Sequence, residues 1–198
     1  MKKVLITGNR NYGLCEAICN LFDTVDYIDY RTISRGDGFY LDKDEDQQKV
    51  ADLFVNDKYD IFINNAALWK FHQVMLAEKV HNTAQVYKHP CHLIHMGSTA
   101  DTGVKGRTWR YPTEKKALKA YNRDLTYLAQ GGSNIKSTIV SPGSLTTPSV
   151  IKKHPDRALL DVEYIAKVIL WLIEQPDYVN INEISLDPIQ NGIFAKER

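Results

Sequence analysis

The stretch "RYPTEKKALKAY", residues 110–121, places a tyrosine four positions before a lysine. In a helix, Tyr111 and Lys115 would lie on one face, a turn apart. An ammonium group beside a phenol favours the phenolate, so the phenol pKa would fall from about 10 toward a range useful for proton transfer. The chain holds 11 tyrosines and 25 lysines and arginines, and such a composition yields roughly one Tyr-x-x-x-Lys by chance. The pair therefore indicates chemistry only in the company of other residues.

A glycine-containing turn near the start of the chain offers that company. In "VLITGNRNYGLCEAI", an expected strand at residues 3–7 leads through the turn into an expected helix at residues 14–22. Gly8 permits a tight turn, and Gly13 lets the backbone approach phosphate groups at the helix N-terminus. Cys15 stands where the dinucleotide-binding fingerprint has its third glycine, and one extra residue separates the first two. The turn alone fits a dinucleotide site and an ordinary strand–turn–helix equally well.

Apolar runs bounded by turn residues alternate with helical patterns along the rest of the chain. This alternation predicts a parallel sheet covered by helices. The other strands are expected at residues 25–29, 38–42, 59–66, 92–97, 136–141 and 182–187. The other helices are expected at residues 44–57, 71–88, 113–129 and 161–175, the last capped by Asp161 and followed by Pro176. The sequence predicts one α/β domain over residues 1–198, a doubly wound, mainly parallel sheet with helices on both faces.

Composition argues against several classes of function. A chain of 198 residues can bury a sizeable core without disulfides. Its 25 basic and 24 acidic residues give a net charge of +1, which predicts neither a nucleic-acid nor a membrane partner. Three cysteines without a C-x-x-C pair indicate reduced thiols. The apolar run before Gly8 is too short for a signal peptide or a membrane span, so we expect a soluble cytoplasmic protein.

Three polar segments follow expected strands: "NNAA" (64–67), "HMGST" (95–99) and "SPGSLTTP" (141–148). They would meet at the carboxyl edge of the sheet, where doubly wound folds bind ligands. With "TGNRNYG", with Ser98 thirteen residues before Tyr111, and with the Tyr111–Lys115 pair, they make the chain resemble the short-chain dehydrogenase/reductase family. The resemblance covers nearly the whole chain and implies a Rossmann-like fold, an NAD(P) cofactor and a small alcohol or carbonyl substrate.

The resemblance also implies catalytic roles. Tyr111 would be the general acid in carbonyl reduction, and the base in the reverse direction. Lys115 would lower the pKa of that tyrosine and hydrogen-bond the nicotinamide ribose, while Ser98 would hold the substrate oxygen. These roles agree with physical chemistry, because hydride transfer builds negative charge on oxygen and requires a donor there. Asn82 is the candidate for the family's catalytic asparagine, at an unusually short distance before Ser98, and the alternative is an exposed helix residue.

Further family positions imply contacts to the cofactor. Thr147 matches the threonine that contacts the carboxamide, in a loop shaped by Pro142 and Gly143. Asp42 matches the acid near adenine after the third expected strand. Asn64 and Ala66 would flank the adenosine ribose.

The choice between NAD and NADP stays open in the sequence. Asp29, at the end of the expected second strand, could accept hydrogen bonds from the ribose hydroxyls and so select NAD. Arg10 in the glycine turn and Arg31 just after that strand could instead bind a 2′-phosphate. The alternative for both arginines is an exposed side chain paired with Asp29 or with water.

Two other signals carry less weight. "HPCHLIHMG" holds three histidines and a cysteine, yet His92 and His95 would point to opposite faces of a strand, so no metal site is predicted. Residues 144–160 fall where the family carries a substrate lid, here a short one. His154 and Arg157 could meet an acidic substrate there, or could be solvated lid charges.

The leading hypothesis is an NAD(P)-dependent dehydrogenase or reductase acting on a CH–OH or C=O group. The main alternative is a non-catalytic dinucleotide-binding sensor or regulator on the same fold. A sugar-nucleotide epimerase would need a substrate domain for which this length leaves no room. A homo-oligomer is also possible, because apolar residues recur at helical spacing in "ALKAYNRDLTYL", where they would serve either the core or an interface.

Overall fold

A computed structural model of the protein describes residues 1–102 and 110–189. Its centre is one six-stranded sheet in which every pair of neighbouring strands is parallel. The strands are β1 (Lys2–Thr7), β2 (Ile28–Ile33), β3 (Ile61–Asn64), β4 (Cys91–Met96), β5 (Ile135–Pro142) and β6 (Glu183–Leu186). Their order is β2-β1-β3-β4-β5-β6. The predicted doubly wound α/β fold is confirmed.

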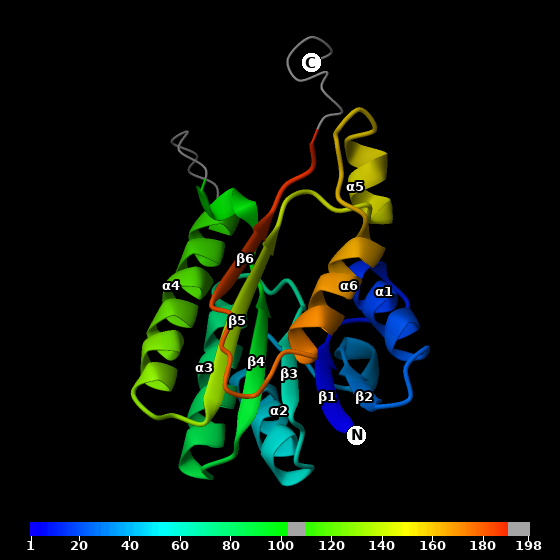
Figure 1. Ribbon diagram of the computed structural model, residues 1–198. Helices are drawn as coiled ribbons and strands as arrows, with labels where there is room; N and C mark the ends of the chain where they lie inside the picture. The colour runs from blue at the N-terminus through cyan, green and yellow to red at the C-terminus, as the bar shows by residue number, and fades with distance from the viewer. Residues whose placement is uncertain (103–109, 190–198) are drawn as a thin grey trace.

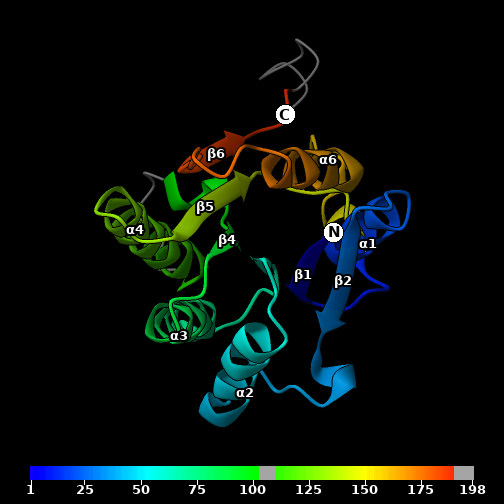
Figure 2. The ribbon, with the colours of Figure 1, turned by 60° about the horizontal axis from the view of Figure 1, so that its bottom comes forward.

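Helices cover both faces of this sheet (Figure 2). One face carries α1 (Gly13–Phe22) and α6 (Val162–Ile173), and the other carries α2 (Asp44–Asn56), α3 (His72–Val86) and α4 (Arg110–Gln130). The short α5 (Pro148–Lys153) lies beyond the carboxyl edge, at the top of Figure 1. Asp161 caps α6 as predicted, because its carboxylate accepts a hydrogen bond from the Glu163 backbone N at 3.1 Å.

The core forms two layers, one on each face of the sheet. Ile6 and Ile18 belong to the layer under α1 and α6, and Leu5 and Phe54 belong to the layer under α2, α3 and α4. Val4, Leu5 and Ile6 of β1 thus point alternately into the two layers, and these three residues are apolar because both faces of the sheet are covered. Burying each such side chain stabilises the fold by roughly 1.5–3 kcal/mol.

The strand order reverses between β1 and β3, since β2 lies on one side of β1 and every later strand lies on the other. Ligands of such sheets bind outside the carboxyl ends of the strands at this point. Thr7, Asn64, Met96 and Pro142 end four neighbouring strands at that edge, so the loops after them border one space.

The expected second strand was placed too early in the chain. It spans Ile28–Ile33, and Lys3 of β1 pairs with Asp29. β2 is an edge strand, so exposed polar residues alternate with less exposed ones along its whole length. That alternation continues through "YRTI", which the apolar run at 25–29 did not include.

The expected third strand at residues 38–42 is wrong. Gly38 has φ +84° and ends a short 3-10 helix, η1 (Arg35–Asp37), after which the chain turns directly into α2. Leu41 is buried and Phe39 packs against the same core layer. These apolar residues, which suggested a strand, pack against the core and hold the loop in place. They pair with no strand of the sheet.

α4 is fixed along its length by ion pairs. Lys119 Nζ lies 3.5 Å from Asp101 Oδ2 in η2 (Thr99–Thr102) and also pairs with Glu183 of β6. Arg123 Nη2 lies 3.6 Å from Glu183 Oε2. A row of residues at four-residue spacing therefore faces η2 and the sheet: Tyr111, Lys115, Lys119 and Arg123.

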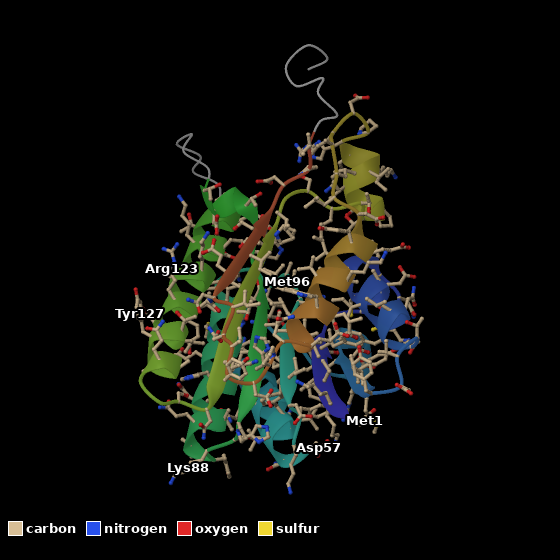
Figure 3. The ribbon with its side chains drawn as sticks, in the orientation of Figure 1. Met1, Asp57, Lys88, Met96, Arg123 and Tyr127 are labelled. Atoms are coloured by element: carbon tan, nitrogen blue, oxygen red, sulfur yellow. The ribbon has the colours of Figure 1, made fainter. Side chains whose placement is uncertain are left out.

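The apolar residues of α4 divide between two roles. Leu118 and Leu125 are buried in the core, whereas Leu128 is 47% exposed and Tyr127 is 69% exposed. Figure 3 shows Tyr127 on the outer side of the helix. The homo-oligomer stays a prediction from the sequence. Within residues 1–102 and 110–189, no helix combines the length and apolarity needed to cross a membrane.

Candidate active site

The structure brings Ser98, Tyr111 and Lys115 together at the carboxyl edge of the sheet. Ser98 follows β4, and the other two lie in the first turns of α4. A hydrogen bond joins Ser98 and the Tyr111 phenol. Lys115 Nζ lies 5.5 Å from the centroid of the Tyr111 ring. Residues that are thirteen and four positions apart in sequence thus form one polar cluster.

The electrostatics of Tyr111 differ from the expectation. Burial raises the pKa of its phenol, and the hydrogen bond with Ser98 opposes that rise. The Trp69 ring, 6.0 Å away between centroids, helps to exclude water. In the chain alone, therefore, Tyr111 holds its proton at neutral pH, and the expected lowering of its pKa by Lys115 does not prevail.

Lys115 is a buried ammonium with two direct acceptors. Its Nζ donates to the Gln73 Oε1 atom at 2.8 Å and to the Met96 carbonyl oxygen at 2.7 Å. Burial lowers its pKa to about 8, against an opposing effect of the nearby Glu114 carboxylate. Titration near neutrality makes this lysine a candidate for proton transfer.

Gln73 is the site residue that the sequence did not indicate. It is buried in the first turn of α3, and its Nε2 donates to the carbonyl oxygens of Asn64 and Met96 at 2.9 and 3.2 Å. Lys70 and Phe71 just before it adopt left-handed backbone conformations, with φ +59° and +63°. Such strain is typical of functional sites. A glutamine inside a helical pattern carries no signal of this role.

Asn82 does not take part in the cluster. It is exposed on α3, nine residues beyond Gln73, with its Oδ1 3.2 Å from the neighbouring His81 Nδ1. Nine residues of helix span about 13 Å, which carries Asn82 away from the carboxyl edge. Gln73 on the same helix contacts Lys115 instead.

The glycine turn lies against Thr147. A Cβ on Gly13 would stand 3.2 Å from Thr147 Cγ2, and a Cβ on Gly8 would stand 2.7 Å from Asn65 Nδ2. Both glycines have positive φ, +143° at Gly8 and +60° at Gly13. The turn is therefore an open cradle at the start of α1, and its shape fits a pyrophosphate there.

In the "NNAA" segment, the residues that line the cleft are not the two that the sequence suggested. Asn64 is fully buried and its Nδ2 donates to the Gln73 carbonyl oxygen at 3.0 Å. Ala66 packs against the core, and its backbone N donates to Thr7 Oγ1 at 3.0 Å. Asn65 and Ala67 line the cleft in their place. Side chains alternate along the segment, and the expectation chose the inward set.

Asp29 and Arg31 lie away from the carboxyl edge. Asp29 is the second residue of β2, at its amino end, and Arg31 is in the middle of the strand beside Tyr59. Both assignments rested on a strand ending at residue 29. Since the strand continues to Ile33, neither side chain is placed to select a cofactor.

Arg10 is also engaged elsewhere. Its guanidinium pairs with Asp23 at 2.8 Å, after the end of α1, and hydrogen-bonds the Tyr30 hydroxyl. These contacts draw the side chain along the outside of α1 and β2.

Ser34 and Arg35 occupy the carboxyl end of β2. Ile33 next to them accepts a hydrogen bond from Gly8 N at 2.9 Å, so this end borders the glycine turn. Arg35 lies beside the Tyr40 ring, 5.9 Å from its centroid, and 3.9 Å from the Asp42 carboxylate. Asp42 precedes α2 near this edge, although not at the end of a strand.

Pro142 and Gly143 lead from β5 toward the end of β6. Gly143 N donates to the Leu186 carbonyl oxygen at 2.7 Å, and a Cβ on Gly143 would stand 2.5 Å from Asp187 Oδ1. The close approach explains the glycine at this position.

His92 and His95 have separate surroundings. His92 Nε2 lies 2.7 Å from Thr138 Oγ1, and His95 Nδ1 lies 3.5 Å from Asn64 Nδ2. Among the described residues, no group of three or more potential metal ligands comes together.

A cleft of about 1190 Å³ lies beside the catalytic cluster. Ser98, Tyr111 and Lys115 border it, together with Thr147 and Asn65. Its remaining wall comes from the segment 144–160, whose ends pair through Leu160 N and the Ser144 carbonyl oxygen at 2.8 Å. A cleft of this size can hold a dinucleotide and a small substrate.

Comparison with known proteins supports the fold more than the details. No family model matches the chain. It is similar to an uncharacterized oxidoreductase of Staphylococcus aureus (strain MW2), with 34% identity over 100 residues. That match covers 50% of this chain and 42% of the relative, so the chain matches less than half of the relative's length.

Solved structures match most of the chain at low identity. The 3-alpha-hydroxysteroid dehydrogenase from Pseudomonas sp. B-0831, complexed with NADH, has a TM-score of 0.75 and 15% identity, covering 94% of this chain and 95% of that one. A closed serine dehydrogenase complexed with NADP+ has a TM-score of 0.67 and 17% identity, covering 92% and 93%. A short-chain dehydrogenase/reductase family protein has a TM-score of 0.71 and 19% identity, and the match covers 94% of this chain and 95% of that one. The chain therefore has the fold of the short-chain dehydrogenases/reductases.

Proposed function

We propose that the protein is a cytoplasmic NAD(P)-dependent oxidoreductase acting on a small alcohol or carbonyl compound, with Ser98, Tyr111 and Lys115 as its active site. The observation that carries the proposal is the hydrogen bond between Ser98 and Tyr111, with the Lys115 ammonium beside the same ring. The similarity to curated oxidoreductases supports it. Three buried free thiols are consistent with a reducing compartment.

The residues present fit a dinucleotide. The cradle formed by Gly8 and Gly13 would hold the pyrophosphate, and Thr147 against Gly13 would contact the nicotinamide end. When bound, the nicotinamide supplies or accepts the hydride. The chain itself therefore has to provide only the groups that transfer the proton.

Proton transfer belongs to Tyr111. In carbonyl reduction, Ser98 donates a hydrogen bond to the substrate oxygen, and the Tyr111 hydroxyl releases its proton to the same atom as negative charge develops. The raised pKa of Tyr111 keeps it protonated for this step. Lys115 has one N–H left after its bonds to Gln73 and Met96, and that donor would bind the nicotinamide ribose.

We further propose that NADP is the preferred cofactor. Arg35 follows the carboxyl end of β2, next to Ser34, and would bind a ribose 2′-phosphate there. Asp29, the acid that favoured NAD in the sequence, is at the other end of the strand. A guanidinium beside an aromatic ring recognises phosphate well.

Two measurements test the proposal. Titration with NADH and NADPH by calorimetry should give a dissociation constant in the micromolar range for at least one of them. With an alcohol panel, the wild type should then reduce the oxidised cofactor, while Tyr111→Phe should bind it with unchanged affinity and lose at least about 100-fold in kcat. A Tyr111→Phe variant with full rate would refute the catalytic assignment. Binding without turnover across the panel would favour the sensor instead.

A further inference from the structure

The segment 144–160 places basic side chains on the wall of the cleft that Ser98 and Tyr111 also border. Lys153 ends α5, and His154 and Arg157 follow it in the loop that returns to Leu160. All three line the same cleft as the catalytic cluster.

Arg157 is the best fixed of the three. Its Nη1 donates to Ser144 Oγ at 3.2 Å, and Ser144 follows Gly143 at the end of β5. The backbone bonds of Leu160 to Ser144 and Thr146, at 2.8 and 2.9 Å, close the loop that carries Arg157. The guanidinium is therefore held at the sheet edge.

In residues 1–102 and 110–189, no acidic side chain lies within ion-pair distance of Arg157, Lys153 or His154. An arginine has five N–H donors, and the Ser144 hydroxyl accepts from one of them. Two carboxylates also line the cleft, Asp156 and Asp187, and Asp187 already accepts a hydrogen bond from Thr99 Oγ1 at 2.7 Å.

Arg157 and the glycine turn contact different residues of the segment 144–160. Thr147 contacts Gly13, which follows β1, whereas Ser144 is next to Gly143, which bonds to Leu186 of β6. β1 and β6 are separated by β3, β4 and β5 in the sheet. The Arg157 guanidinium thus contacts the part of the segment 144–160 that follows β5, whereas Thr147 of the same segment contacts the glycine turn.

We propose that Arg157 is a specificity residue that binds a carboxylate on the substrate, which is a small hydroxy acid in the oxidative direction. The inference rests on the proposed function. A bidentate guanidinium–carboxylate pair fixes both position and orientation. It would hold the hydroxyl carbon of the acid near Ser98 and Tyr111, with the Lys153 ammonium adding positive potential.

The reaction balances with the groups named. The C–H bond of the hydroxyl carbon breaks, and its electron pair and hydrogen reduce the oxidised nicotinamide. The Tyr111 phenol, which is protonated in the chain alone, first releases its proton to solvent. The hydroxyl proton of the substrate then passes to the phenolate oxygen, and the substrate leaves as an oxo acid. The carboxylate keeps its charge throughout, so its pairing with Arg157 contributes to binding in both directions.

The test compares acids with their neutral amides. A panel of hydroxy acids, including glycerate and 3-hydroxybutyrate, is assayed beside the matching amides for reduction of NADP+. We expect kcat/KM for the best acid to exceed that for its amide by at least about tenfold. Arg157→Leu should remove this difference by lowering kcat/KM for the acid, and Arg157→Lys should restore part of it.

A binding measurement separates failure of this inference from failure of the proposed function. Tyr111→Phe saturated with NADP+ is titrated with each acid and amide by calorimetry, so that turnover does not interfere. Tighter binding of an acid, lost in the Tyr111→Phe/Arg157→Leu double variant and kept when Lys152→Ala is the second change, supports the inference. Lys152 is the matched control because it lies on α5 but does not line the cleft.

Equal affinity for acids and amides, or binding of neither when NADP+ is bound, would overturn the role of Arg157 and leave the proposed function standing. Failure of the wild type to bind NADH or NADPH would overturn the proposed function itself.

Discussion

Lys115 Nζ lies 2.8 Å from Gln73 Oε1, and both side chains are buried beneath the ends of β3 and β4. Gln73 also donates to the backbone carbonyl oxygens that end those strands, so the amide is held in one orientation with its oxygen toward the ammonium. The position of the ammonium is therefore set by the sheet through Gln73.

Gln73→Leu should change the titration of Lys115. Burial already lowers the pKa of Lys115 to about 8, and loss of the acceptor should lower it further because the charged form loses a hydrogen bond. The alkaline limb of the pH profile of kcat/KM for carbonyl reduction should move to lower pH by about one unit. Steady-state kinetics between pH 6 and 10 measure the shift.

Gln73→Glu provides the opposite case. A carboxylate at this position keeps the acceptor and adds negative charge, so the limb should move to higher pH. Gln85→Leu, on the exposed side of the same helix, should leave the profile where it is. Identical profiles for Gln73→Leu and the wild type would refute the role of Gln73.

Arg35→Ala should change the choice of cofactor. If Arg35 binds the 2′-phosphate, the wild type should bind NADPH at least about tenfold more tightly than NADH, and the variant should bind both alike. Arg31→Ala is the matched control, because Arg31 lies in the middle of the same strand. A preference for NADH in the wild type, or an NADPH preference that survives in Arg35→Ala, would show the assignment to be wrong.

Gly97→Ala should destabilise the protein and disturb Ser98. A Cβ at Gly97 would clash with Ser141 Oγ and would stand 2.9 Å from Ile139 Cδ1. Overpacking of this kind costs roughly 1–3 kcal/mol of unfolding free energy. Urea unfolding should show the loss, and Ser141→Ala in the same chain should recover part of it. Gly36→Ala, whose Cβ would have no neighbour closer than 3.5 Å, should remain close to wild type.

The buried histidines should make the fold sensitive to acid. Burial lowers the pKa values of His92 and His95 to about 3, from an ordinary value of 6.5. Below pH 6.5 the unfolded chain takes up protons that the folded chain does not, so stability falls as pH drops toward 3. One such histidine accounts for on the order of 3 kcal/mol at pH 4.

His92→Gln tests this effect, because a glutamine can still bond to Thr138 but does not titrate. Its unfolding free energy should fall less than that of the wild type between pH 7 and pH 4. His154→Gln, at an exposed position, should follow the wild type. If the unfolding free energy falls equally with pH in His92→Gln and in the wild type, the lowered pKa of His92 is contradicted.

Hydrophobic periodicity and residue spacing predicted those parts of the protein that depend on local sequence. The buried strands, the α6 cap at Asp161 and the Tyr111–Lys115 pair follow from local sequence. The meeting of Ser98 with Tyr111 was implied by the family resemblance. β2 was displaced because an edge strand alternates polar and apolar residues, and an apolar run marks only part of it. Because the strand was placed too early, Asp29 was wrongly expected at its carboxyl end.

The role of Gln73 and the contact that positions Arg157 could not be predicted from sequence patterns, for another reason. The contact of Gln73 with Lys115 depends on two left-handed residues before α3, and neither Lys70 nor Phe71 is a residue type that indicates such a conformation. The contact of Arg157 with Ser144 depends on how the segment 144–160 closes on itself. Both contacts join residues that are far apart in sequence or connected by irregular structure, so no local pattern predicts them.

The four-residue spacing of Tyr111, Lys115, Lys119 and Arg123 makes α4 sensitive to its helical phase. One residue inserted between Lys115 and Lys119 would rotate the two halves of the row by about 100° relative to each other. The ion pairs of Lys119 and Arg123 with Asp101 and Glu183 would then hold one half in place and turn Tyr111 away from Ser98. The pairing with η2 and β6 thus sets the angle at which the phenol enters the cleft.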